Sequence, residues 1–201
     1  MSFEARLVGN YMKCVGEMRI LQNLQGLSTL FDFYLIGMSP FQLVQNLRPD
    51  YWDVAYVQKH DTRFNHNVLP GLSDRPVYGQ HFFKEDGVTV RFQSGQSMWN
   101  RWGDGREFTS KRLARMGNFN VNCVTLRMNA DIVVGKYTEI DYPLYYTSSF
   151  VRALEEKVLD LSPIARQRDM SDRMKEWIRK TYTDFLRDHK RWTLSEELAD
   201  L

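Results

Sequence analysis

QHFFKEDGVTVRFQ, residues 80–93, gives the clearest local indication of the fold in this chain. Asp86-Gly87 is a dipeptide that favours the type I′ turn of a β-hairpin, because both central residues of that turn need a positive φ. After the turn, apolar residues from Val88 to Phe92 alternate with polar ones, as in a strand that is buried on one face. The stretch therefore predicts a hairpin within an antiparallel sheet.

Strand patterns continue on both sides of the hairpin. Trp52, Val54 and Tyr56 alternate with their neighbours, and the segment 119–126 alternates again. The segment 131–142 is interpreted as another strand, with a bulge at Gly135 as an option. No strand–helix–strand rhythm is present, which argues against a parallel, doubly wound sheet. Residues 49–147 are therefore expected to form an antiparallel β domain, either a sandwich or a small barrel.

Helical patterns flank this region. Residues 1–48 carry an apolar stripe at steps of three and four, and three glycines weaken the helix by roughly 1 kcal/mol each. Residues 148–201 carry a second stripe from Met170 to His189, together with eleven acidic and eleven basic residues. The expected fold class is α+β, with a central β domain between an N-terminal helical arm and a C-terminal helical segment.

Composition limits the classes of partner and compartment. The chain of 201 residues has a net charge of only +2, so nothing in it demands a polyanionic partner. Its two cysteines lack the spacing of a zinc knuckle or a disulfide scaffold. The N-terminus does not resemble a secretory signal, and the apolar run Leu30–Met38 is too short to span a bilayer. We expect a soluble protein that is not secreted and has no membrane partner.

The segment HDTRFNHNVLPG, residues 60–71, is a candidate metal site. His60, Asp61 and His66 offer imidazole and carboxylate ligands of the kind that hold a transition metal in some nucleases. The Leu-Pro-Gly corner that follows does not supply the helix that such a nuclease needs. We therefore expect a polar turn with no metal, and keep the metal site as part of an alternative.

Aromatic and basic side chains mark candidate contact surfaces. Tryptophan and arginine interleave from Trp99 to Arg115, which suits a protein–protein interface and, as an alternative, the stacking of bases and binding of phosphates along Arg101–Arg115. Tyrosines crowd the segment 137–146, and they offer a large contact area with one polar tip. The interface candidates are Trp99, Arg101, Trp102, Tyr142, Tyr145, Tyr146 and Trp177.

Motifs of catalysis are not evident in the sequence. GDGREF, residues 103–108, is not a dinucleotide-binding GxGxxG, and neither a phosphate-binding Walker loop nor a GxSxG nucleophile elbow occurs. The acidic pairs in the C-terminal segment lie beside basic residues and are explained by solvated helix faces. We therefore expect no catalytic residues, no cofactor and no enzymatic activity.

The β region also resembles a known family. PDYWDVAYVQK, VLPGLSDRPVYGQ, DGVTVRFQ and MWNRWG, within residues 49–103, follow the order of elements in tail-tube and related baseplate or neck proteins of tailed bacteriophages. The resemblance covers about a quarter of the chain, and both helical flanks depart from it. It implies a ring-forming β-sandwich without catalytic residues.

Three functions follow from these observations. The first is a structural protein of a virion, whose helical arms pack on further copies of the chain or on other structural proteins. The alternative is a metal-dependent nuclease or nucleic-acid-binding factor that uses His60, Asp61, His66 and the loop Arg101–Arg115. A third is a small adaptor that docks through the C-terminal stripe.

Overall fold

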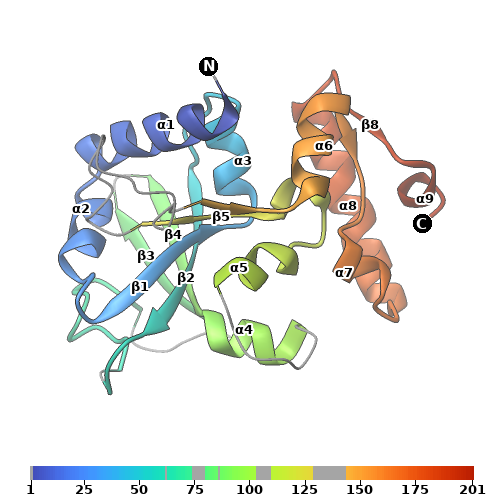
Figure 1. Cartoon of the computed structure of the whole chain (residues 1–201). Coiled ribbons are helices and arrows are strands. Elements are labelled where there is room, and N and C mark those ends of the chain that lie inside the picture. The colour runs from blue at the N-terminus through green and yellow to red at the C-terminus, as the bar shows by residue number, and fades with distance from the viewer. Residues whose placement is uncertain (1, 62, 74–79, 86, 103–109, 129–143) are drawn as a thin grey trace.

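The computed structural model shows an α+β chain in which helices flank a central sheet (Figure 1). It describes the chain except residues 1, 62, 74–79, 86, 103–109 and 129–143, and except the side chains of residues 99, 101, 102 and 110. The expected fold class is confirmed. The described strands form one open sheet of six, with no closed barrel, and a separate pair of short strands.

The elements follow one another along the chain with few long connections between them. The helices are α1 (Phe3–Glu17), α2 (Arg19–Gly26), α3 (Met38–Val44), α4 (Gly95–Trp102), α5 (Ser110–Leu113), the 3₁₀ turns η1 (Ala114–Met116) and η2 (Asn120–Asn122), α6 (Ser148–Glu156), α7 (Pro163–Arg166), α8 (Asp172–Asp188) and α9 (Glu196–Ala199). The strands are β1 (Phe31–Ile36), β2 (Tyr51–Gln58), β3 (Gln80–Glu85), β4 (Val88–Ser94), β5 (Val124–Arg127), β6 (Leu144–Tyr146), β7 (Val158–Leu159) and β8 (Thr193–Leu194).

The sheet has the strand order β3-β4-β2-β1-β5-β6 and mixes both pairing directions. The hairpin expected at residues 80–93 is confirmed as β3 and β4, with Gly87 at φ +78° in the turn between them. Strands β2 and β4, however, pair in parallel, with Asp53 opposite Arg91. This one parallel pairing brings side chains from distant parts of the sequence to the same place on the sheet.

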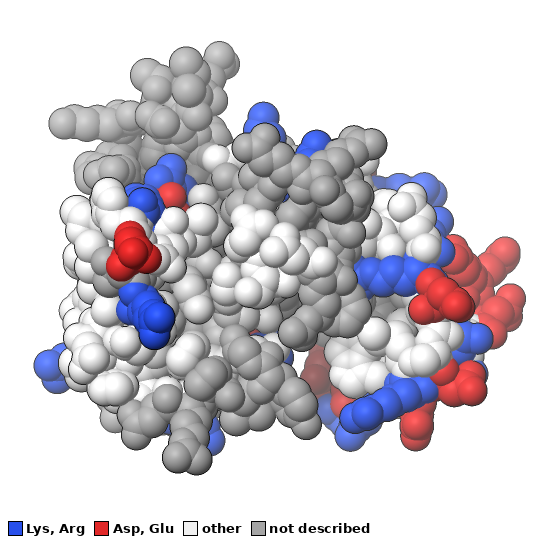
Figure 2. Space-filling model, turned by 90° about the horizontal axis from the view of Figure 1, so that it is seen from below, with Lys and Arg blue, Asp and Glu red and all other residues white. Residues whose placement is uncertain are grey.

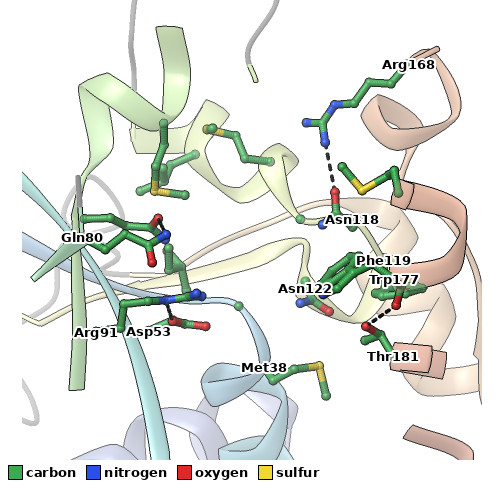
Figure 3. Close-up of a pocket in the computed structure, with 18 of the residues that line it drawn as sticks. Met38, Asp53, Gln80, Arg91, Asn118, Phe119, Asn122, Arg168, Trp177 and Thr181 are labelled. Carbon is green, nitrogen blue, oxygen red and sulfur yellow. Dashed lines mark hydrogen bonds and ion pairs between the residues drawn. The ribbon is translucent and has the colours of Figure 1, made fainter. Parts of the chain in front are cut away.

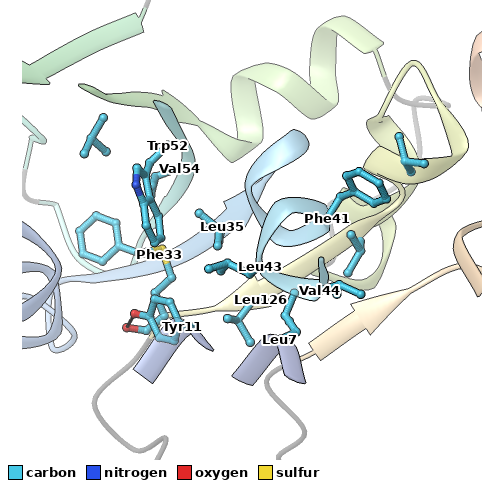
Figure 4. Packing of buried hydrophobic residues seen from close by; sticks show 14 of the residues in the cluster. Leu7, Tyr11, Phe33, Leu35, Phe41, Leu43, Val44, Trp52, Val54 and Leu126 are labelled. Carbon is cyan, nitrogen blue, oxygen red and sulfur yellow. Dashed lines mark hydrogen bonds between the residues drawn. The ribbon is translucent and has the colours of Figure 1, made fainter. Parts of the chain in front are cut away.

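One face of the sheet carries the main core. Residues alternate along the strands, so Phe33, Trp52 and Phe92 point to the same side and are fully buried. Helices α1 and α3 cover this side, where Leu7 and Phe41 are also fully buried (Figures 1 and 4). Burying apolar area on this scale is the dominant stabilising contribution to a domain of this size.

The opposite face carries a smaller apolar cluster beneath α4, α5 and η1. It consists of Tyr34, Ile36, Ala55, Leu113 and Met116, with Met98, Val57 and Tyr145 packed against it. This side of the sheet is only partly covered, because the C-terminal helices stand beyond its edge and do not lie across it (Figure 1).

The C-terminal helices are tied to the sheet by buried polar contacts around η2. Asn120 donates its side-chain amide to the carbonyl of Val158 (2.9 Å) and accepts from the backbone N–H of Asp160 (3.1 Å). Asp160 in turn accepts a hydrogen bond from the hydroxyl of Ser195 (2.6 Å). These bonds connect η2, β7 and the start of α9, which fixes the position of the C-terminal segment against the sheet.

The N-terminal segment differs from the expected helical arm. It contains strand β1, which lies inside the sheet between β2 and β5. The apolar stripe of α1 is covered by the chain itself, since Leu7 and Tyr11 are fully buried. The argument that this stripe needs a neighbouring subunit is therefore removed. The division into three parts at residues 48 and 147 stays a prediction.

Two further strand predictions fare differently. The segment 119–126 begins with the 3₁₀ turn η2 and becomes a strand only from Val124, so that prediction is half right. The strand expected at 131–142 lies outside the described residues. Among the helices that are described, none combines the length and the apolar character needed to cross a membrane.

Candidate functional site

A cavity of about 580 Å³ lies between the second face of the sheet and the C-terminal helices. This volume is within the range of pockets that bind small molecules and cofactors. Figure 3 shows Gln80, Asp53 and Arg91 on one side of the cavity, with Phe119, Asn122, Trp177 and Thr181 on the other. Strands therefore build one wall, while η2 and α8 build the opposite wall.

The sheet wall is centred on an ion pair between Asp53 and Arg91. The two residues face each other across the parallel pairing of β2 and β4, and Nε of Arg91 donates to Oδ1 of Asp53 at 2.6 Å. The guanidinium group also lies 5.5 Å from the centre of the Tyr51 ring, in a cation–π contact. Arg91 is thus held by a carboxylate and by a ring from the same neighbouring strand.

Burial dominates the electrostatics of this pair. The side chain of Asp53 is only 14% exposed, and that of Arg91 is 29% exposed. Burial raises the pKa of Asp53 above its ordinary value, while the charge and the hydrogen bond of Arg91 act in the opposite direction. Arg91 therefore favours the ionised form of a carboxylate that burial disfavours.

A tight corner between β1 and α3 places the backbone against the same carboxylate. Gly37 has φ +68° and ψ −137°, a conformation that suits only glycine. Two residues later, the hydroxyl of Ser39 accepts from the backbone N–H of Asp53 and donates to the carbonyl of Tyr51, both at 3.2 Å. These contacts lock the corner to strand β2 and fix where Asp53 lies in the pocket.

The opposite wall presents an aromatic surface. Trp177 is 46% exposed although it is a large apolar residue, and it lines the cavity. The buried Phe119 supports it, with the two ring centroids 6.4 Å apart and an interplanar angle of 31°. An exposed ring that is held in place from behind is suited to stacking on a flat ligand.

Polar and cationic groups complete the lining. Arg168 donates to the side-chain oxygen of Asn118 at 3.0 Å, and burial lowers its pKa. Arg173, in the first turn of α8, also lines the cavity. Among the described lining residues there are three arginines and one carboxylate, Asp53, so the cavity favours an anionic ligand.

The histidine segment lies away from this cavity. His60, Asp61 and His66 are exposed in the connection between β2 and β3, and none of them lines the pocket. The backbone N–H of Asn67 donates to the side chain of Asn65 at 3.0 Å, which is the local bond of a polar turn. The described residues contain no group of three or more His, Cys, Asp or Glu side chains placed to hold a metal ion.

The interface candidates are distributed over several places. Trp99, Arg101 and Trp102 lie on α4, where their side chains are outside the described atoms, and Tyr142 is outside the described residues. Tyr145 packs against the smaller apolar cluster, and Tyr146 is 42% exposed and donates to Glu4 at 3.2 Å. Among the candidates whose side chains are described, Trp177 lines the cavity. Their role in binding other proteins stays a prediction.

Sequence reasoning did not single out the two residues at the centre of the site. Asp53 and Arg91 each occupy a polar position of a predicted strand, so their faces follow from the alternation. Their proximity depends on the parallel pairing of β2 with β4, for which the sequence gives no local indication. The one feature of the sequence that could have indicated these site residues is a charged residue in the middle of each half-buried strand.

The chain was compared with known proteins at the levels of sequence and structure. No protein-family model matches it, and a search of curated protein sequences finds no significant match. Solved structures do match. A "tRNA-processing enzyme (apo form 2)" aligns with a TM-score of 0.57 and 12% identity over 90% of this chain and 46% of its own. A tRNA nucleotidyltransferase complexed with a primer tRNA and an ATP analogue aligns with a TM-score of 0.55 and 13% identity, covering 90% and 48% of the two chains.

A CCA-adding enzyme in complex with ATP also aligns, with a TM-score of 0.55 and 16% identity over 92% of this chain and 40% of its own. The chain shares the fold of these three enzymes. It spans less than half the length of each of the three. At these levels of identity the similarity extends to the fold alone.

The comparison corrects the expectations of a virion protein. The resemblance to tail-tube, baseplate and neck proteins is wrong, because the structures that share this fold are described as tRNA-processing and CCA-adding enzymes. The expectation of a non-enzymatic structural component of a phage tail is contradicted by the same finding. The short strand motifs that suggested it occur in many antiparallel sheets, and they carried no information on strand order.

The donor set of the pocket was tested against the metal centre that nucleotide transfer commonly uses. Such centres hold two divalent cations about 3.5–4 Å apart between several carboxylate oxygens. Here one oxygen of Asp53 already accepts a bond from Arg91, and the next residue on the same face of β2 is the buried Ala55. With one carboxylate among the described lining residues, the side chains present do not fit a two-metal centre.

Proposed function

We propose that the chain binds a nucleotide in this pocket and is an enzyme that acts on RNA, with nucleotidyl transfer as its class of reaction. The observation that carries the proposal is a cavity lined by an exposed aromatic ring and three arginines, set in a fold shared with a tRNA nucleotidyltransferase. Three of the similar structures are described as complexes with CTP, with ATP, or with a primer tRNA and an ATP analogue, which supports the same class of ligand.

The two walls suit the two ends of a nucleotide. A base is flat and stacks on an aromatic ring, and such stacking contributes about 1–3 kcal/mol per base. Trp177 offers an exposed ring that is supported by Phe119. Phosphates are anionic and are recognised by arginine, which Arg91 on the sheet wall and Arg173 on α8 provide. The proposed ligand therefore spans the cavity from Trp177 to the sheet.

RNA would approach over the segment α5–η1, at the rim of the cavity. Leu113 and Met116 line the pocket, while Lys111 and Arg115 of the same segment are exposed. This arrangement places positive charge beside the opening. It supports the nucleic-acid alternative of the sequence analysis for this part of the loop Arg101–Arg115. On the face seen in Figure 2, by contrast, basic and acidic residues intermix over the C-terminal helices, so no charge of single sign is concentrated there.

The decisive experiment is a nucleotide-incorporation assay with the full chain. Purified protein is incubated with unmodified or 3′-truncated tRNA and each radiolabelled ribonucleoside triphosphate in turn, with magnesium or manganese present. We expect extension of the RNA by one or a few nucleotides. The test variant is Trp177→Ala, which removes the aromatic side chain from an exposed position and should reduce incorporation without unfolding the chain.

Two results would overturn the proposal. If no triphosphate binds and no RNA is extended, the pocket does not have this function. If extension occurs equally in the Trp177→Ala variant, another part of the molecule is responsible. Association of the chain with further copies of itself stays a prediction, which sedimentation velocity at several concentrations would test.

A further inference from the structure

The ion pair between Asp53 and Arg91 bears on which group neutralises the phosphates of a bound nucleotide. Resting on the proposed function, we infer that Arg91, and not a divalent cation held by Asp53, binds the phosphates, so that nucleotide binding does not require a metal ion. This differs from the arrangement in which a carboxylate cluster holds two cations that neutralise the phosphates.

Arg91 retains hydrogen-bond donors for a ligand. Guanidinium groups have five N–H donors, and the bond to Asp53 uses the one at Nε. Within the described part of the chain, its terminal amino groups make no hydrogen bond. Arg91 lines the cavity, and the two terminal amino groups of a guanidinium group match the geometry of phosphate oxygens.

Asp53 acts in this arrangement as an anchor of Arg91. Its Oδ1 accepts from Nε, and the Tyr51 ring packs against the guanidinium group, so the side chain of Arg91 is held before any ligand arrives. Preorganisation of this kind lowers the entropic cost of binding. An arginine this close to Asp53 also repels any cation that would bind the same carboxylate, and no second carboxylate follows on this face of β2 because position 55 is alanine.

The test is equilibrium binding of ATP to the full chain, measured by isothermal titration calorimetry with excess magnesium and, separately, with excess EDTA. We expect the two dissociation constants to agree within about threefold. Arg91→Gln should weaken binding about 10- to 100-fold in both conditions, because it removes a charged donor. Asp53→Asn should retain binding in EDTA within about threefold, because the amide oxygen still accepts from Nε of Arg91.

The chain offers a closely matched control pair on the same face of the sheet. Arg127 of β5 donates to Asp32 of β1 at 2.8 Å and 3.2 Å, with 37% of the arginine side chain exposed, and neither residue lines the cavity. Arg127→Gln should therefore leave ATP affinity unchanged. Thermal unfolding of each variant shows whether it is folded, and the comparison of magnesium with EDTA in the unmodified chain needs no variant.

The outcomes separate this inference from the proposed function. The inference is supported if the unmodified chain binds ATP with equal affinity in magnesium and in EDTA, if Arg91→Gln weakens this binding, and if Arg127→Gln does not. Binding that disappears in EDTA, or in Asp53→Asn with magnesium present, would overturn it while leaving the proposed function intact. Failure of ATP to bind in either condition would instead overturn the proposed function, and the inference with it.

Discussion

A Cβ atom built on Gly37 would lie 2.7 Å from Oδ2 of Asp53, closer than van der Waals radii permit. The glycine also has a positive φ of 68°, and Asp53 is held by Arg91, so neither partner is free to move away. We expect Gly37→Ala to lower the free energy of unfolding by about 1–3 kcal/mol and to weaken ATP binding. Urea denaturation and calorimetry measure the two effects.

Gly16, in the last turns of α1, is the matched control for this substitution. A Cβ atom there would meet no heavy atom within 4 Å. Gly16→Ala should therefore stabilise the chain, by about 0.5–1 kcal/mol, because alanine is the better helix former. Equal stability changes for the two substitutions would contradict the close approach at Gly37.

The aromatic wall predicts a specific effect of Trp177→Ala. Because the ring is 46% exposed, its removal should change the free energy of unfolding by less than about 1 kcal/mol. Loss of stacking should weaken ATP binding about 5- to 100-fold. Tyr146→Ala, at an exposed ring that does not line the cavity, is the control and should bind ATP normally.

The rim of the cavity predicts salt-dependent RNA binding. Lys111→Glu and Arg115→Glu should each weaken tRNA binding and lower the slope of log K against log salt by about 1 for each phosphate that is no longer neutralised. Filter binding over a series of salt concentrations measures the slope. Arg187→Glu, in the last turn of α8 and paired with Asp184, should leave it unchanged. A similar weakening in all three variants would indicate a general charge effect and not a binding site.

His189 predicts a dependence of stability on pH. Burial among Phe41, Phe185 and Trp192 lowers the pKa of His189, and Asp188 opposes this. The unfolded state therefore binds the proton first as the pH falls through about 6.5, so the free energy of unfolding decreases below that pH. The decrease should be smaller in His189→Asn. Urea denaturation at several pH values between neutral and mildly acidic would show it, and identical pH profiles would contradict the assignment.

Both thiols should be unreactive in the folded chain. Cys14 and Cys123 are buried, and burial raises the pKa of Cys123 to about 11. At pH 8 about one thiol in a thousand is then ionised at that position, and only the thiolate reacts. Ellman's reagent should label neither cysteine in the native state and both in denaturant. Rapid labelling of the native chain would show that one of these sites opens readily.

The features of this fold that depend on residues close together in the sequence could be predicted, whereas those that depend on distant residues could not. The turn at Gly87, the alternation in β2 and the stripe along α8 are local patterns, and all three are confirmed. Strand β1 was missed because a short, mostly apolar segment does not distinguish a buried strand from a helix. The fold class could therefore be predicted from the sequence, whereas the order of the strands in the sheet could not.

The candidate site was harder to predict from the sequence, because it depends on pairing between segments that are distant in sequence. Asp53 and Arg91 are 38 positions apart, and the residues of the aromatic wall come from η2 and α8. Composition placed Trp177 among the interface candidates without indicating that it faces a cavity. The phage resemblance rested on short strand motifs, which are common to unrelated sheets and do not specify how the strands are connected.

The aromatic cluster behind the pocket couples its two walls mechanically. Phe41 of α3 packs against Phe185 of α8, with ring centroids 5.6 Å apart, and against Trp192 at 5.2 Å, so the helix that follows the Gly37 corner touches the helix that carries Trp177. Any change in the spacing of the walls has to rearrange these rings. A ligand that draws the walls together would therefore change the surroundings of Trp192 without touching it.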